Sequence, residues 1–276
     1  MSEVDEAGPV REAAARLFAD QVSNRLREAA ERGERPEALW RLCEDTGLLD
    51  ALGAAPSVDG LGAAAAIASE AGRHAVPLPL VDAMVARWSG DASAAPASER
   101  IDVVARPAAR PFAQAPGPVR RVHLALRLQQ AAGAMEGALA ISVRYAGERV
   151  QFGRPLGAFQ AVAHPLAVAA EEAASARVAA DHAVRQLAGR GLHDEIAWRA
   201  LAVARIRSAE ASGRVVEVTH QAHGAIGFTR EYGLHHFTRR LLAWRDEHGS
   251  DAWWAAELGR RVAAHGALWL FTTEAD

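Results

Sequence analysis

Residues 144–160 read RYAGERVQFGRPLGAFQ, and this stretch is the sharpest break in an otherwise helical half of the chain. A helix ends here in a cationic loop that contains several glycines, and a new helix is predicted to begin near Ala158. Arginines in such a loop can pair with a phosphate or pyrophosphate, and the N–H groups of a helix start add further donors. Phe152 could lie against a ring, and Gln160 could hydrogen-bond an amide-like edge. The same residues are also compatible with a solvated loop whose arginines only cap the first helix.

Helical patterns surround this loop on both sides. Downstream of residue 119 the apolar periodicity predicts helices at about 120–147, 158–188, 195–223, 234–246 and 251–268. Long helices joined by short turns favour a bundle. Helical patterns also fill the first 75 residues, and Val81–Trp88 is predicted to be a further helix. The predicted fold class is therefore all-α.

A proline-rich interval separates the two helical regions. Residues 89–119 contain five prolines, which break helices, and Ile101–Val104 looks strand-like. The interval is too short for a domain of its own, so we interpret it as a linker or vestigial β segment. The predicted organisation is an N-terminal helical region at 1–88, this linker at 89–119, and a C-terminal helical bundle at 120–276.

Composition excludes several classes of protein. The 276 residues carry a formal net charge of −3, so no overall basic field would attract nucleic acid. No apolar run approaches the roughly 18 residues of a membrane span, and Met1–Glu6 is acidic without a signal core. We therefore expect a cytoplasmic protein with no nucleic-acid or membrane partner. The glycine-rich loops of common nucleotide sites and the G-x-S-x-G elbow of hydrolases do not occur.

Metal and thiol chemistry are not predicted either. The single cysteine, Cys43, lies in an apolar run and is expected to be a core residue. The histidine pairs His220/His223 and His235/His236 have no carboxylate at a recurring ligand spacing, so no metal site is predicted.

A second stretch, QAHGAIGFTREY at 221–232, belongs with the first. The pattern R-x-x-F-G-[RK]-P-[LI]-x-x-[FH]-Q of the first stretch resembles the signature that opens the long C-terminal helices of acyl-CoA dehydrogenases. The second is similar to that family's Q-x-x-G-G-x-G-[FY]-x-x-E-[YH] segment, at the expected distance downstream. The resemblance implies the family's helical N-terminal region and C-terminal four-helix bundle, with FAD as cofactor and the middle β domain largely missing.

The resemblance also implies roles for single residues. Arg149 and Phe152 match residues that contact the FAD bound mainly by a neighbouring subunit, and Gln160 matches a glutamine near its adenosine end. Gln221 and Gly224 match a backbone turn against the pyrophosphate. Ala225 and Ile226 depart from the family pattern, since Ala225 stands where most members have a second glycine, which should crowd that contact.

The missing β domain implies a partner. Family members hold the flavin ring and the acyl thioester with that domain, so this chain is not expected to enclose a flavin alone. It resembles the shortened subunits of the heteromeric acyl-CoA dehydrogenases of actinobacterial steroid catabolism. The implied assembly is a heterotetramer with a larger homologous subunit. It would act on an acyl-CoA, with a steroid side-chain CoA as the favoured substrate, and pass electrons to an electron-transfer flavoprotein or similar acceptor. The alternative is a non-catalytic subunit that completes the partner's FAD site and stabilises the oligomer.

The catalytic base is the open question. The reaction removes an α-proton, so a carboxylate must face the substrate. In the family this glutamate precedes a glycine, and here the residue before Gly249 is His248, with Glu247 one position earlier. One position on a helix rotates a side chain by about 100°. Glu247 is the candidate base, with Asp246 a poorer one, unless the partner supplies the base instead.

Overall fold

The computed structural model describes residues 7–55, 57–90, 117–229 and 232–272. Short helices make up the N-terminal region, and their ends follow local signals. Ser23 caps α2 by accepting a hydrogen bond from the backbone N of Leu26, and α5 ends at Gly90 with a positive φ of 70°. The helices are α1 (Ala7–Gln21), α2 (Asn24–Glu31), α3 (Glu37–Asp45), η1 (Leu48–Asp50), α4 (Leu61–Arg73) and α5 (Leu80–Ser89).

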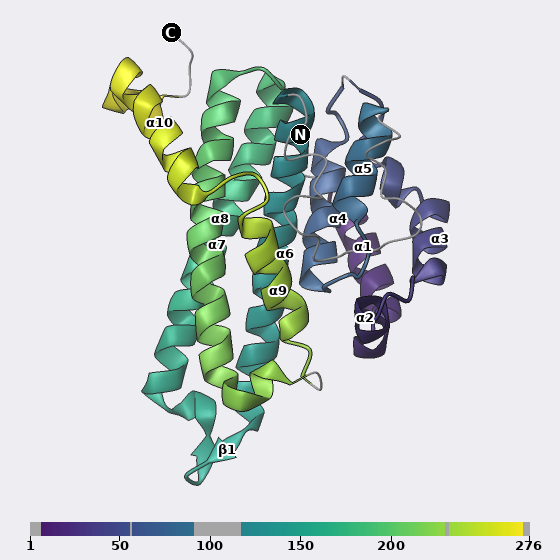
Figure 1. Ribbon diagram of the computed structural model, residues 1–276, viewed down its shortest axis with the longest axis vertical. Helices are drawn as coiled ribbons and strands as arrows, with labels where there is room; N and C mark the ends of the chain where they lie inside the picture. Colours follow the sequence, from purple (N-terminus) through teal and green to yellow (C-terminus); the bar gives the residue numbers. More distant parts are fainter. Residues whose placement is uncertain (1–6, 56, 91–116, 230–231, 273–276) are drawn as a thin grey trace.

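Long helices form the C-terminal region. Figure 1 shows α6, α7 and α8 side by side along the long axis, with α9 against them and α10 extending from the upper end. Asp194 and Ser250 cap α8 and α10 with their side chains. The elements are α6 (Gly117–Glu148), β1 (Val150–Gln151), β2 (Arg154–Pro155), η5 (Leu156–Ala158), α7 (Gln160–Arg190), α8 (Glu195–His223), η6 (Gly224–Phe228), α9 (His235–Arg245), α10 (Asp251–His265) and η7 (Ala267–Leu270).

Two glycines bring the N-terminal region against the bundle. A Cβ on Gly72 of α4 would lie 1.9 Å from the carbonyl oxygen of Gln130, and one on Gly133 of α6 would lie 1.9 Å from that of Ser69. Helices α4 and α6 therefore touch backbone to backbone, which only glycine permits. One hydrophobic core runs from Phe18 of α1 to Trp254 of α10 and joins the two regions.

The all-α prediction is confirmed. Across the described residues the strands are limited to the pair β1–β2, and the helices lie within a few residues of their predicted bounds. The predicted linker falls mainly on residues 91–116, so the strand-like Ile101–Val104 lies outside the described residues. The proposed division at 89–119 stays a prediction.

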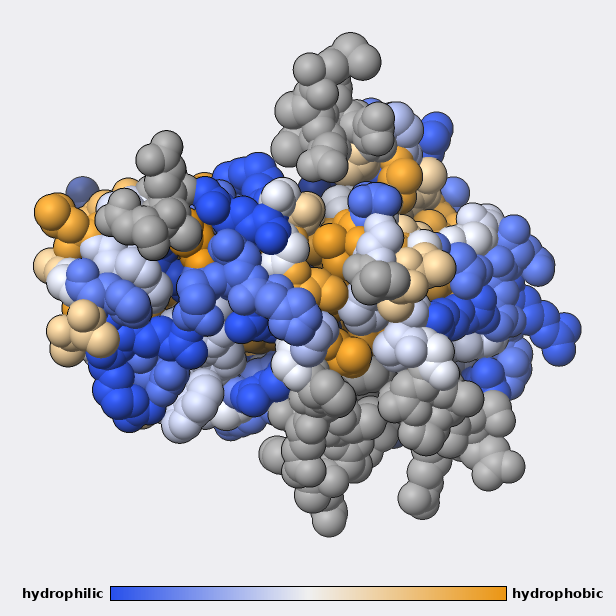
Figure 2. Space-filling view, turned by 90° about the horizontal axis from the view of Figure 1, so that it is seen from above, coloured by the Kyte–Doolittle hydropathy of each residue, from blue (hydrophilic) through white to orange (hydrophobic). Residues whose placement is uncertain are grey.

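The surface is mixed in character. Seen from above the upper end of the bundle, apolar side chains gather near the middle of the face and hydrophilic ones cover much of the rest (Figure 2). None of the described helices combines the length and apolar character that crossing a membrane requires.

Candidate functional site

A strained hairpin projects from the lower end of the bundle, where α6 ends (Figure 1). Val150 pairs with Pro155 and Gln151 with Arg154, leaving Phe152 and Gly153 as the turn. Both turn residues have positive φ, 52° and 79°, the combination of a type I′ turn. Positive φ is unfavourable for an aromatic residue, and such strain persists mainly at functional sites. The strain presents the Phe152 ring to solvent with 91% of its surface exposed.

Arginines lie on the hairpin and at the end of α6 that leads into it. Phe159, just before α7, meets Phe152 edge to face at 6.2 Å, and the Arg154 guanidinium lies 4.0 Å from the Phe159 ring centre. Arg144 and Arg149 are exposed, and neither forms an ion pair with a carboxylate of the described residues. The hairpin therefore offers an aromatic face beside positive charge, which suits a phosphate-bearing ring compound.

The second motif lies at the same end of the bundle. Helix α8 ends at His223, whose ring stacks on Tyr145 of α6 at 4.5 Å. The chain then turns at Gly224, which has φ 61°. Gln160, Gln221 and Gly224 are all exposed. The structure thus brings Arg149, Phe152, Gln160, Gln221 and Gly224 to one end of the molecule.

Glu247 lies elsewhere, in the buried turn after α9. Its carboxylate accepts two hydrogen bonds from Arg127 of α6, with Nε–Oε2 at 2.7 Å and Nη2–Oε1 at 3.3 Å. Arg127 also donates to Asp82 of α5 at 2.9 Å and to Gln130. Burial alone would raise the pKa of Asp82, but the charge of Arg127 holds that pKa well below its usual range. The Glu247 carboxylate is therefore committed to an ion pair.

His248 belongs to the same buried network. Its Nε2 lies 2.8 Å from Nδ1 of His123, whose Nε2 lies 3.3 Å from Asp82. Its carbonyl oxygen accepts hydrogen bonds from Arg120 and Trp254. Burial, followed by the charges of His123 and Arg127, lowers the pKa of His248 well below its usual value, so the ring is neutral. The network holds the turn after α9 against α5 and α6.

Sequence reasoning missed the partners in this network. The stretch around His123 contains no carboxylate of its own, yet Asp82 reaches it from α5. The one available signal was Arg127, a charged residue inside an apolar helical run, because a buried arginine requires carboxylate partners.

A second polar cluster lies between α2 and α9. Glu28 and Glu31 approach the histidine pair His235/His236 at the start of α9. These carboxylates are about 205 residues away in sequence, so no local spacing could reveal them.

Comparisons with known proteins place the fold. The family model described as "Acyl-CoA dehydrogenase, C-terminal domain" matches residues 119–263, more than half of the chain. The chain therefore belongs to the acyl-CoA dehydrogenase family, and the resemblance found in the two motifs is confirmed.

Relatives and solved structures agree with this. The acyl-CoA dehydrogenase IpdE2 of Mycobacterium tuberculosis is 28% identical over 304 aligned positions, covering 87% of this chain and 92% of that protein. IpdE2 of Mycolicibacterium smegmatis is 35% identical over 111 residues, which are 39% of this chain and only 32% of that relative.

Two solved assemblies share the fold. A chain of a Tcur3481–Tcur3483 steroid ACAD variant superposes with a TM-score of 0.76 at 23% identity, covering 96% of this chain and 100% of that one. A chain of the ChsE4–ChsE5 complex from Mycobacterium tuberculosis also gives 0.76, at 17% identity, covering 95% of this chain and 98% of that one.

Proposed function

We propose that this chain is the shortened subunit of a heteromeric, FAD-dependent acyl-CoA dehydrogenase, and that it completes a FAD site held mainly by a larger homologous partner. The observation that carries the proposal is the contrast between its two candidate sites. The hairpin end is exposed, strained and cationic, whereas the Glu247 carboxylate is buried and paired with Arg127. The chain therefore exposes the groups that would contact a neighbour's cofactor, and it buries the carboxylate of its own candidate base.

The hairpin end fits a flavin nucleotide. Arg149 would pair with its phosphates, Phe152 would cover an aromatic ring, and Gln160 would hydrogen-bond near the adenosine end. Gln221 and Gly224 would lay the turn after α8 against the pyrophosphate, where the exposed Gly224 leaves the backbone open. Ala225 is exposed rather than packed, so it crowds this turn less than the motif comparison predicts. Bound FAD would supply the hydride acceptor for α,β-dehydrogenation of an acyl-CoA thioester.

The outer face of α7 also favours a partner. The helix buries one stripe, from Leu166 to Leu187, against the bundle. The opposite face exposes small apolar residues with few charges, including Ala163, Ala167, Ala170, Ala174 and Val178. A larger homologous subunit could cover this face in the proposed heterotetramer.

The substrate and setting rest on the family and its relatives. A steroid-derived acyl-CoA is proposed because one solved assembly with this fold is a steroid ACAD. A partner subunit is proposed because the other solved structure is a complex of two chains. An electron-transfer flavoprotein or similar acceptor would reoxidise the enzyme, and a cytoplasmic location stays a prediction from sequence.

A co-purified complex of this chain and a larger homologue tests the proposal. The complex should form enoyl-CoA from a steroid side-chain acyl-CoA, and neither chain alone should do so. Full activity of the larger chain by itself would contradict a shared site.

A further inference from the structure

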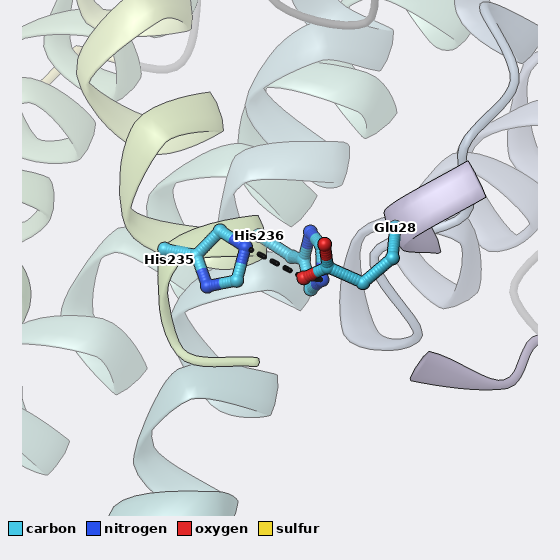
Figure 3. Close-up of side chains that lie close together, drawn as sticks. All are labelled: Glu28, His235 and His236. Atoms are coloured by element: carbon cyan, nitrogen blue, oxygen red, sulfur yellow. Dashed lines mark ion pairs between the residues drawn. The ribbon is translucent and has the colours of Figure 1, made fainter. Parts of the chain in front are cut away.

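Glu28, His235 and His236 form a compact group of ligand atoms between α2 and α9 (Figure 3). Nε2 of His235 lies 3.2 Å from Oε1 of Glu28, and Nε2 of His236 lies 3.3 Å from the same oxygen. The two imidazoles lie against each other with ring centres 3.9 Å apart. Figure 3 shows Glu28 reaching from α2 toward both rings.

The facing atoms of His236 and Glu28 leave a gap in this group. Nδ1 of His236 lies 2.8 Å from Oε1 of Glu31, so this ring nitrogen already has a partner. Nε2 of His236 and Oε1 of Glu28 are both buried, and neither has a hydrogen-bond partner among the described residues. Buried polar atoms without a partner are unfavourable, and a cation between these two atoms would satisfy both.

The spacing matches a particular kind of cation. Ligand atoms bound at about 2.0–2.1 Å to a tetrahedral zinc lie roughly 3.3 Å from one another. The two distances to Oε1 of Glu28 have this value, and all three ligand atoms lie within 4.8 Å of one another. Two imidazoles and one carboxylate are a ligand set that zinc prefers and magnesium or calcium does not.

Glu31 fits the role of the outer carboxylate in such a site. Metal-binding histidines usually donate their second ring N–H to a carboxylate, which fixes the ring. Oε2 of Glu31 also lies 3.7 Å from Nε2 of His235. The positive charges of two arginines disfavour a cation at this position. Arg239 pairs with Glu31 from a largely exposed position, and the buried Arg240 donates to the carbonyl of His236.

We propose that Glu28, His235 and His236 bind a divalent transition-metal ion of the zinc class, with Glu31 orienting His236. The two carboxylates balance the charge of the ion, while screening weakens the effect of Arg239. The ion would join the N-terminal region to the bundle, since α2 and α9 contribute ligands from opposite ends of the chain. It is a structural site, and it does not rest on the flavin proposal.

Titration of the full-length chain with Zn²⁺ after chelator treatment tests this. We expect one Zn²⁺ per chain by calorimetry, a tetrahedral Co²⁺ absorption spectrum, a higher melting temperature with Zn²⁺, and no binding of Mg²⁺. Glu28→Gln and His235→Gln should each abolish tight binding. Glu31→Gln, which removes only the orienting carboxylate, should weaken it about 10- to 100-fold.

His193→Gln is the matched control, because His193 is exposed in the loop between α7 and α8 and should leave the affinity unchanged. Circular dichroism of each metal-free variant checks that it folds. Absence of stoichiometric Zn²⁺ binding by the folded wild-type chain would overturn the proposal. A proton between His236 and Glu28 would then account for the contact. Undiminished binding in the folded double variant Glu28→Gln/His235→Gln would also overturn it, because the ion would then lie elsewhere.

Discussion

Arg127 and Glu247 form a two-point ion pair inside the protein, 120 residues apart in sequence, with Nε and Oε2 2.7 Å apart. Both side chains are more than 90% buried. A carboxylate held in this way cannot accept a substrate proton without breaking the pair. We therefore expect the pair to have a structural role and the partner to supply the base.

Glu247→Gln should lower stability far more than turnover. Removing one member of a buried pair typically costs about 3 kcal/mol or more, because the remaining charge loses its partner. Turnover of the flavin-loaded complex should stay within about tenfold, since loss of a true general base costs roughly 10²–10⁴-fold. Chemical denaturation of the chain and steady-state rates of the complex measure the two effects.

Asp246→Asn is the matched control, since it makes the same charge change one residue earlier at an exposed surface pair with Arg245. It should change stability by no more than about 0.5 kcal/mol. A 10²-fold loss of turnover in Glu247→Gln, with normal flavin content, would instead show that Glu247 is the base.

Arg149→Ala should weaken FAD retention by the complex about 10- to 100-fold, because it removes a charge-assisted contact to phosphate. Flavin release measured by fluorescence gives the dissociation constant. Arg41→Ala, which removes an exposed arginine of α3 in the N-terminal region, should have no effect. Equal constants for the Arg149 variant and wild type would remove Arg149 from the cofactor site.

Phe152→Asn should separate stability from function. Asparagine before Gly153 is the preferred pair for a type I′ turn, so the chain should become more stable by roughly 1 kcal/mol. The complex should nevertheless retain FAD less well, because the exposed ring is gone. A destabilised chain, or unchanged flavin affinity, would mean that the positive φ of Phe152 has no role in binding the cofactor.

His248→Gln should reduce the fall in the free energy of unfolding that accompanies a decrease in pH. The folded state keeps this histidine neutral, and the unfolded state takes up a proton below about pH 6.5, so stability falls as pH drops through that value. One such group contributes a slope of about 1.4 kcal/mol per pH unit. Other buried histidines add to the slope in both proteins, so the test is the difference between wild type and variant in denaturation at pH 5 to 7.5. Parallel profiles would contradict the assignment.

Sequence alone predicted the helices well and a cationic loop at 144–160, but not the β1–β2 hairpin within that loop. Apolar periodicity is a local signal, read from residues that are neighbours in the chain. The pairing of Glu247 with Arg127, and of Glu31 with His236, depends on tertiary contacts between distant helices. Counting positions before Gly249 therefore identified a candidate base but could not show that its carboxylate was already paired.

Flavin content tests the central claim most directly. We predict that the chain expressed alone is colourless, and that its complex with the larger homologue contains fewer flavins than chains, with one FAD for each pair of unlike subunits. The visible absorbance spectrum of each preparation, with protein concentration, gives the ratio. A stoichiometric flavin spectrum from the isolated chain would contradict the account, because this chain would then hold the cofactor without a partner.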